Sequence, residues 1–239
     1  ELWESVHTLQ FTGGEPIINK EHYDLLESIP QHLKSGIKLR YASNLSYIKF
    51  KQYDLIKIWN EFQSVNIKIS MDGIGDVYNF IRQDGDWDNV YSNMLALNNE
   101  PTIDVAAGIT VQAHNVFHMP EFYDYWKTSE VDLRFVTANI LQTPRYLTPS
   151  VWPEEYREAI INKLTNALDR HPEMQRFINY MKNNEPNIRD YAKMRKYNRD
   201  LEARYPKTIS LKSMVKDHLN MSLEGMDIVH NRLTKEQGK

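Results

Sequence analysis

The sequence predicts an α/β protein whose first part is a parallel sheet built from strand–helix–strand units. Two observations support this prediction. Strand-like and helix-like segments alternate through the first 145 residues, which is typical of a parallel sheet. From Pro153 onward only helical periodicity is found, which predicts a C-terminal helical extension. We therefore assign residues 1–148 to the sheet domain and residues 149–239 to the extension.

Five short segments are predicted to be strands because their apolar runs and alternating patterns are those of buried strands. Each ends in glycine or polar residues, successively GGE, SN, SMDG, TVQ and NILQ. In a parallel barrel the carboxyl ends of the strands converge on one rim, where active sites lie. We therefore expect Glu15, Asn44, Ser70, Asp72 and Gln112 at one edge of the sheet. The predicted strands are Thr8–Phe11, Ile37–Ala42, Val65–Met71, Ile103–Val111 and Val131–Leu141.

The helices are predicted from apolar residues at three- and four-residue steps. In the extension this spacing joins Tyr156, Ile160 and Leu164, and prolines at 172 and 206 interrupt the helical pattern. The predicted helices are Lys20–Leu33, Lys51–Phe62, Trp87–Leu97, about Pro120–Lys127, one from Pro153 onward, Glu173–Lys182 and Ile188–Ala203.

Composition narrows the classes of function. With 41% hydrophobic and 26% charged residues in 239, the chain has the composition of an ordinary globular protein. There is no apolar run of about 18 residues, so we expect no membrane partner and a cytoplasmic location. The chain has no cysteine, which excludes disulfides, a thiol nucleophile and cysteine-ligated metal within it. Because Glu1 runs almost directly into a core strand, we expect a further segment upstream.

Histidines and basic residues give weaker signals. His114 and His118 are four residues apart, but Pro120 follows and no HExxH frame is present. We therefore expect exposed loop histidines rather than a zinc pair, and no metal site. Residues 189–239 carry 12 Lys and Arg against 7 Asp and Glu. A solvated helical surface explains this excess better than a nucleic-acid partner.

The stretch LQFTGGEP, Leu9–Pro16, is the central motif. It indicates a buried strand that stops at a tight turn where the backbone approaches a ligand closely, although a plain chain reversal has the same pattern. Ser70 and Asp72 lie two residues apart on a predicted strand and project to the same side. Arg82 could bind a carboxylate or pair with Asp84 or Asp86. Asn44 could bind a ligand or cap the next turn.

Together these motifs resemble the core of the radical S-adenosylmethionine enzymes, in particular the branch with SPASM or twitch extensions. The resemblance covers roughly residues 5–145 and rests on FTGGEP, the strand ending in SN, and SMDG followed by an arginine. It implies a partial (βα) barrel of six strands in which Thr8–Thr12 is the second strand. The first strand of the barrel is then missing from this sequence.

The resemblance also implies a cofactor site. The GGE motif would bind the amino group of the methionine moiety, and SMDG would hold the ribose and the methionyl part. The arginine would bind the methionine carboxylate. The ends of the last two strands would flank adenine. These pairings suit the chemistry, because an ammonium needs acceptors and a carboxylate needs a guanidinium fork. The implied cofactor-binding residues are Thr12, Gly13, Gly14, Glu15, Asn44, Ser70, Asp72, Arg82, Thr110, Gln112, Ile140 and Leu141.

The activity implied by the resemblance is radical chemistry. An intact enzyme would cleave S-adenosylmethionine reductively with a 4Fe-4S cluster, and the resulting radical would abstract hydrogen from a peptide or protein substrate. A flavodoxin or ferredoxin would supply the electron. The CxxxCxxC loop that holds the cluster in this family is absent here. We expect that loop upstream of Glu1, and we expect the chain as given to be inactive in radical chemistry.

Two alternatives stay open. One is a barrel hydrolase or lyase in which Glu15 and Asp72 act as acid and base. The other is a non-catalytic barrel that binds a ligand or a peptide.

Overall fold

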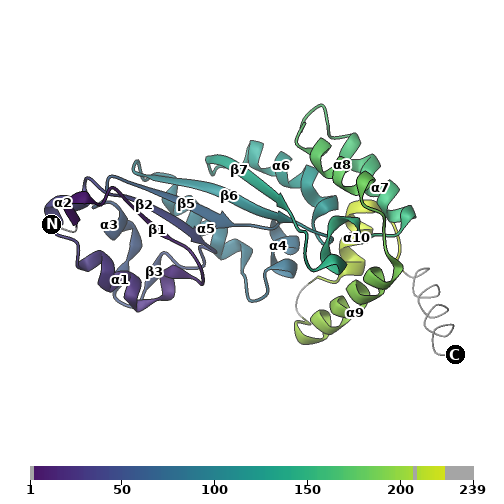
Figure 1. The fold of residues 1–239 in the computed structure, drawn as a ribbon, viewed down its shortest axis with the longest axis horizontal. Coiled ribbons are helices and arrows are strands. Elements are labelled where there is room, and N and C mark those ends of the chain that lie inside the picture. The colour runs from purple at the N-terminus through teal and green to yellow at the C-terminus, as the bar shows by residue number, and fades with distance from the viewer. Residues whose placement is uncertain (1–2, 207–208, 224–239) are drawn as a thin grey trace. The chain divides into compact units, whose positions relative to one another are not determined.

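A computed structural model describes residues 3–206 and 209–223 (Figure 1). The chain divides into two compact units, and each is built from stretches that are separated in the sequence. The first unit contains the residues up to Asp72, Asp84–Ile109 and Tyr125–Asn139. The second contains Gly73–Gln83, Thr110–Asp124 and the described residues from Ile140 onward.

The main sheet is five-stranded, and its order, β1-β2-β5-β6-β7, is the order of these strands along the chain. The pairs β1–β2, β2–β5 and β5–β6 are parallel. The Thr137 hydroxyl donates to the Ala107 carbonyl at 3.2 Å, which ties β7 to β6. The prediction of an α/β protein with a parallel sheet is confirmed. These strands are β1 (Thr8–Phe11), β2 (Lys38–Ser43), β5 (Ser64–Ser70), β6 (Ile103–Val111) and β7 (Leu133–Ile140).

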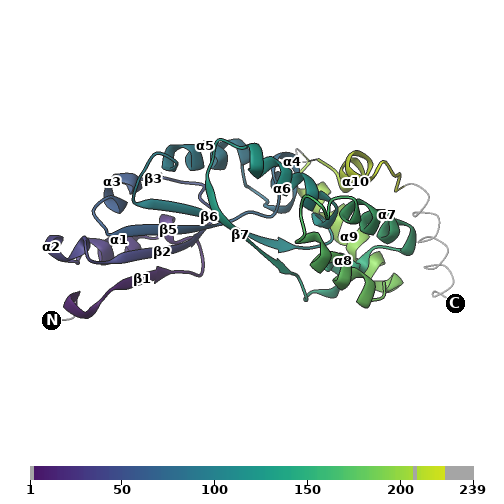
Figure 2. The same cartoon turned by 90° about the horizontal axis from the view of Figure 1, so that it is seen from above.

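Helices cover one face of this sheet in the first unit. Along β2, Leu39 and Tyr41 are buried while Lys38 and Arg40 are exposed, so the alternation of the strand separates a core face from an open face. The Tyr41 ring lies 5.4 Å from the ring of Trp59. Figure 2 shows α3 and α5 on one side of the sheet. The helices of this unit are α1 (Lys20–Glu27), α2 (Gln31–Lys34), α3 (Leu55–Trp59) and α5 (Trp87–Leu97).

Two predicted helices are shorter than expected. The single helix expected over Lys20–Leu33 is two helices, because Pro30 lacks a backbone N–H and disfavours a helical conformation at the residue before it. The helix expected over Lys51–Phe62 begins only at Leu55, where the Asp54 side chain caps it. The residues before it form a small antiparallel hairpin of β3 (Lys49–Phe50) and β4 (Tyr53–Asp54).

The second unit is mainly helical. Its core includes Trp152, Tyr156, Ile160 and Leu164, all at most 2% exposed, so the apolar spacing predicted after Pro153 does form a buried helix face. Two of its helices, α4 and α10, are short and were not predicted. The helices are α4 (Gly75–Ile81), α7 (Glu154–Thr165), α8 (Met174–Asn183), α9 (Ile188–Arg204) and α10 (Leu211–Leu219); α6 (Met119–Thr128) begins in this unit. Within the described residues of both units, the 3-10 helices are η1 (Trp3–Ser5), η2 (Pro16–Ile18), η3 (Val116–His118), η4 (Arg145–Leu147) and η5 (Pro149–Val151).

One sequence-based prediction in this unit is wrong. His114 and His118 were expected to be exposed loop residues, yet they are 3% and 4% exposed. Both follow β6 in a stretch whose apolar neighbours Val116 and Phe117 are completely buried, and this stretch carries the histidines into the core. The basic segment 189–239 lies partly outside the described residues. Within the described part of the chain, no helix combines the length and the apolar character needed to cross a bilayer.

Candidate functional site

The carboxylate of Glu15 is held across the ends of two neighbouring strands. Its Oε1 accepts a hydrogen bond from the Ser43 hydroxyl at 2.7 Å, and its Oε2 accepts one from the Asn44 backbone N–H at 2.7 Å. Oε1 also lies 3.4 Å from the Ile17 backbone N–H and so caps η2. Because an ionised carboxylate offers about four acceptor positions, Glu15 can still accept bonds from a cationic ligand.

The glycines beside Glu15 leave the backbone open. Gly13 has a φ of +105°, a conformation that strongly favours glycine. A Cβ added at Gly13 or at Gly14 would meet no atom within 4 Å. Thr12, Gly14 and Glu15 line one cavity of about 330 Å³ together with His22 of α1. Gly14 and Glu15 of the predicted GGE motif therefore border the same space.

The side chain of Asn44 shapes a turn. Its Oδ1 accepts a hydrogen bond from the Ser46 backbone N–H at 2.9 Å, an Asx-type contact. Leu45 has a φ of 53°, and its carbonyl accepts a bond from the Asn93 side chain of α5. Of the two roles left open for Asn44, the side chain takes the turn role and the backbone N–H serves Glu15. Ser43 and Asn93 hold this loop. Ser43 belongs to the SN strand end, but its bond to Glu15 was not predicted, and no short motif marks Asn93.

Ser70 and Asp72 lie at the carboxyl end of β5. Because β1, β2 and β5 are parallel, these two residues and Glu15 and Asn44 are at the same edge of the sheet, as expected. Ser70 pairs with Gly108 of β6, and the Met71 N–H donates to the Gly108 carbonyl at 2.8 Å. Asp72 is 5% exposed.

The glycine of SMDG gives a stability prediction within the second unit. A Cβ at Gly73 would lie 2.8 Å from Val77 Cγ1 and 3.0 Å from the Tyr78 backbone N. We therefore expect Gly73→Ala to lower the free energy of unfolding by about 1–3 kcal/mol. Gly14→Ala, where the added methyl group meets open space, is the matched control. Equal denaturation midpoints for the two variants would contradict the conclusion that SMDG needs a glycine at position 73 to avoid contact with Val77 and Tyr78.

Five of the predicted cofactor residues belong to the second unit. Arg82 directly follows α4, and Ile140 is the last residue of β7. The Leu141 N–H donates to the Val111 carbonyl at 2.9 Å. Thr110 and Gln112 are fixed by one buried side chain that was missed: Asn115 donates to the Thr110 carbonyl at 3.0 Å and accepts from the Gln112 N–H at 2.7 Å.

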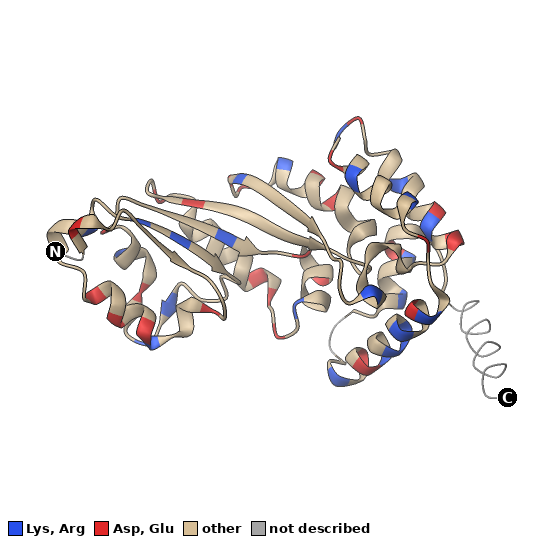
Figure 3. Cartoon of the chain, in the orientation of Figure 1, with Lys and Arg blue, Asp and Glu red and all other residues tan. Residues whose placement is uncertain are grey.

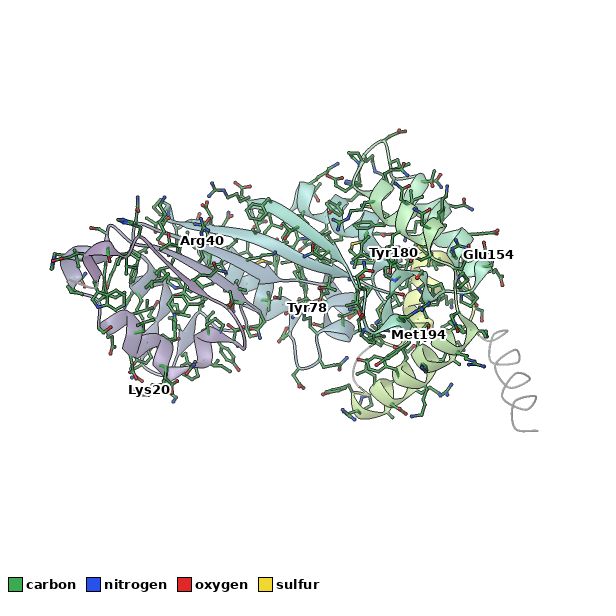
Figure 4. All side chains as sticks on the ribbon, in the orientation of Figure 1. Lys20, Arg40, Tyr78, Glu154, Tyr180 and Met194 are labelled. Atoms are coloured by element: carbon green, nitrogen blue, oxygen red, sulfur yellow. The ribbon has the colours of Figure 1, made fainter. Side chains whose placement is uncertain are left out.

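The open face of the sheet in the first unit carries a second cavity, of about 420 Å³. Arg40 of β2 and Lys68 of β5 are exposed along it, and Arg134 of β7 pairs with Asp104. Figure 3 shows basic positions on β2 and β5, and Figure 4 marks Arg40 on the sheet. Basic residues at alternate positions of a strand are the sequence pattern that indicates this surface, and the surface was not predicted.

The histidine beside the Glu15 cavity makes stability depend on pH. Burial lowers the pKa of His22 to about 4, from 6.5, and its Nε2 lies 2.8 Å from the Tyr41 hydroxyl. The unfolded chain therefore binds the proton more readily. Full stability is present above pH 6.5 and is lost as the pH falls towards 4, by at most about 1.4 kcal/mol per pH unit. Urea unfolding of His22→Phe should show a weaker dependence in this window. An unchanged dependence of the unfolding free energy on pH would contradict the conclusion that buried His22 causes it.

At the edge of β1 and β2, a fixed carboxylate thus faces a cavity beside open glycine backbone. This arrangement suits a ligand with an ammonium group, because acceptors converge there and the nearest glycines admit a close approach. Comparison of the chain with family models, with curated proteins and with solved structures found no match.

Proposed function

We propose that this chain is the S-adenosylmethionine-binding core of a radical S-adenosylmethionine enzyme. The observation that carries the proposal is the Glu15 carboxylate, held by Ser43 and Asn44 beside Gly13 and Gly14. In this proposal Glu15 accepts hydrogen bonds from the methionyl ammonium. The adenosine part would extend along the carboxyl edge towards Ser70.

The topology supports the finer proposal of a partial (βα) barrel. The strands of the sheet follow one another in chain order, without the reversal that defines a doubly wound sheet. Figure 2 shows α3 and α5 on one side of the sheet in the first unit. The cavity lined by Arg40 and Lys68 lies on the open face. A sheet that is wound in one direction and has one uncovered face is compatible with the inner wall of an open, partial barrel.

The residues fit the two cofactors differently. The chain has no cysteine, so its residues do not fit a 4Fe-4S cluster, which is held by thiolates, and we derive no step through that group. The Glu15 cradle does fit the ammonium end of S-adenosylmethionine. Gln10 and Thr12 line both the Glu15 cavity and the open-face cavity. A peptide substrate on the open face would therefore border the bound cofactor.

The hydrolase alternative has less support. Both oxygens of Glu15 already accept hydrogen bonds, which suits a fixed acceptor better than a group that must exchange protons.

Calorimetric titration tests the proposal. We expect S-adenosylmethionine to bind at least about tenfold more tightly than 5'-methylthioadenosine, which lacks the ammonium and the carboxylate; a single charge-assisted hydrogen bond contributes about 1.5–3 kcal/mol. Equal binding of the two ligands would show that Glu15 does not recognise the ammonium. No binding of either ligand at millimolar concentration would refute the proposed function.

A further inference from the structure

A second group of polar residues lies in the second unit, where three ligand-type side chains meet. His118 ends η3, Glu121 is in the first turn of α6, and His218 is near the end of α10. One nitrogen or oxygen atom from each of the three lies within 4.8 Å of the other two. The rings of His118 and His218 have their centroids 4.8 Å apart at an interplanar angle of 74°.

The chain brings these residues together by local spacing and by packing. His118 and Glu121 are three residues apart at the start of a helix, so their side chains share one face. The helix α10, which carries His218, packs against η3 and α7 within this unit, and Figure 1 shows α10 beside α7. Two ligands therefore come from one turn, and the third comes from a helix about one hundred residues later in the sequence.

Two buried atoms of the cluster lack a partner. His118 is 4% exposed, and among the described residues its Nδ1 has no hydrogen-bond partner. The Oε2 of Glu121 is also buried and unpartnered within the described part of the chain. Leaving such atoms unsatisfied costs free energy, and a bound cation would satisfy both. Metal binding at Nδ1 requires the ring proton on Nε2, whose contact with the Ile74 backbone N–H is long, at 3.4 Å.

Lys163 is the competing explanation for this cluster. Its Nζ lies 2.5 Å from Glu121 Oε1 and donates to the His218 carbonyl at 2.8 Å. An ion pair therefore neutralises Glu121 through Oε1 alone. The second oxygen, Oε2, stays available to a cation together with the imidazoles.

We propose that His118, Glu121 and His218 form a binding site for a divalent transition metal, with Zn²⁺ as the best fit. Two imidazoles and one carboxylate are a known zinc ligand set that leaves the fourth position open. A cavity of about 570 Å³ lined by Glu121, Lys163 and His218 gives that position access to solvent or to a small ligand. Imidazole ligands disfavour Mg²⁺ and Ca²⁺, which prefer oxygen.

The site has a consequence for the fold of the second unit. A metal ion bound there would link the start of α6 to α10. Since the ligands meet only in the folded chain, metal binding would stabilise this unit.

Titration of the metal-free chain with Zn²⁺ alone, by competition with a chromophoric chelator, tests the proposal. We expect one equivalent to bind and the melting temperature to rise. His218→Ala and Glu121→Gln should each weaken binding at least about tenfold and abolish the rise. Co²⁺ should bind with the intense visible absorption of a four-coordinate site, and Mg²⁺ should not compete. Tighter binding of Fe²⁺ than of Zn²⁺ would overturn the choice of metal.

Matched variants separate the metal site from the ion pair. Asp217→Asn removes a neighbouring exposed carboxylate of the same cavity, and His32→Ala removes an exposed histidine of α2; both should bind Zn²⁺ like the wild type. Lys163→Met should keep or raise the affinity, because it removes a positive charge beside the metal. Loss of Zn²⁺ binding in Lys163→Met with a folded circular dichroism spectrum, or equal binding by wild type and His218→Ala, would overturn the proposal. His218 is partly exposed, so its replacement leaves a folded chain for comparison.

Discussion

Replacing Leu39 by alanine is expected to lower the free energy of unfolding by about 2–5 kcal/mol, whereas Arg40→Ala should change it by less than about 0.5 kcal/mol. The two residues are neighbours on β2. Leu39 is fully buried, and Arg40 is exposed on the open face. Alanine at position 39 leaves a cavity among packed side chains, while alanine at position 40 removes an exposed side chain.

Equilibrium unfolding in urea measures both variants. This pair tests whether helices cover only one face of the sheet, because a layer of helices on the other face would make both positions costly. Similar losses for Leu39→Ala and Arg40→Ala would contradict the one-sided sheet and with it the partial barrel.

Glu15→Gln is expected to weaken the binding of S-adenosylmethionine by roughly 10- to 100-fold, since it exchanges a charged acceptor for a neutral one. The glutamine keeps a side-chain oxygen that can accept the bond from Ser43 or Asn44, so the turn should fold. Binding of 5'-methylthioadenosine should stay unchanged, because this ligand has no ammonium for Glu15 to contact.

Glu21→Gln is the control for this measurement. Glu21 lines the same cavity, but it is exposed and lies on the helix α1 rather than at the end of a strand. Its replacement should leave both affinities unchanged. Equal losses in the two variants would mean that the general negative charge of the cavity, rather than the geometry of Glu15, attracts the ligand.

Much of the sheet could be predicted from the sequence because its strands are short apolar runs with clear ends. The predicted bounds of Thr8–Phe11, Trp87–Leu97 and Ile103–Val111 agree with β1, α5 and β6. The prediction that Thr8–Phe11 is buried is wrong, because β1 is an edge strand whose residues are exposed or half-buried. The helix Lys20–Leu33 was wrong because its apolar spacing continued across Pro30, whose missing N–H ends α1 locally. The short helix α10 has too few turns for periodicity to identify it.

The strand-end site was predicted in part. The position of Glu15 at the sheet edge could be predicted, because a strand followed directly by GGE is recognisable from neighbouring residues alone. Ser43 was recognised only as part of the SN strand end, and its bond to Glu15 was not predicted. Asn93 and Asn115 carry no motif, because each fixes a loop through side-chain hydrogen bonds that the spacing of apolar residues does not indicate. The group of His118, Glu121 and His218 was missed for the same reason. Its third member, His218, lies on a helix that is distant in the sequence. The spacing of residues along the chain does not show which helices pack together, and therefore it did not show that His118 is buried.

A crystal structure of the chain with bound S-adenosylmethionine tests the central claim most directly. The account predicts the methionyl ammonium within hydrogen-bond distance of a Glu15 carboxylate oxygen and next to the backbone of Gly13 and Gly14, with Ser43 and Asn44 still bonded to Glu15. A cofactor bound elsewhere in the molecule, or one that places its adenine rather than its ammonium at Glu15, would contradict it.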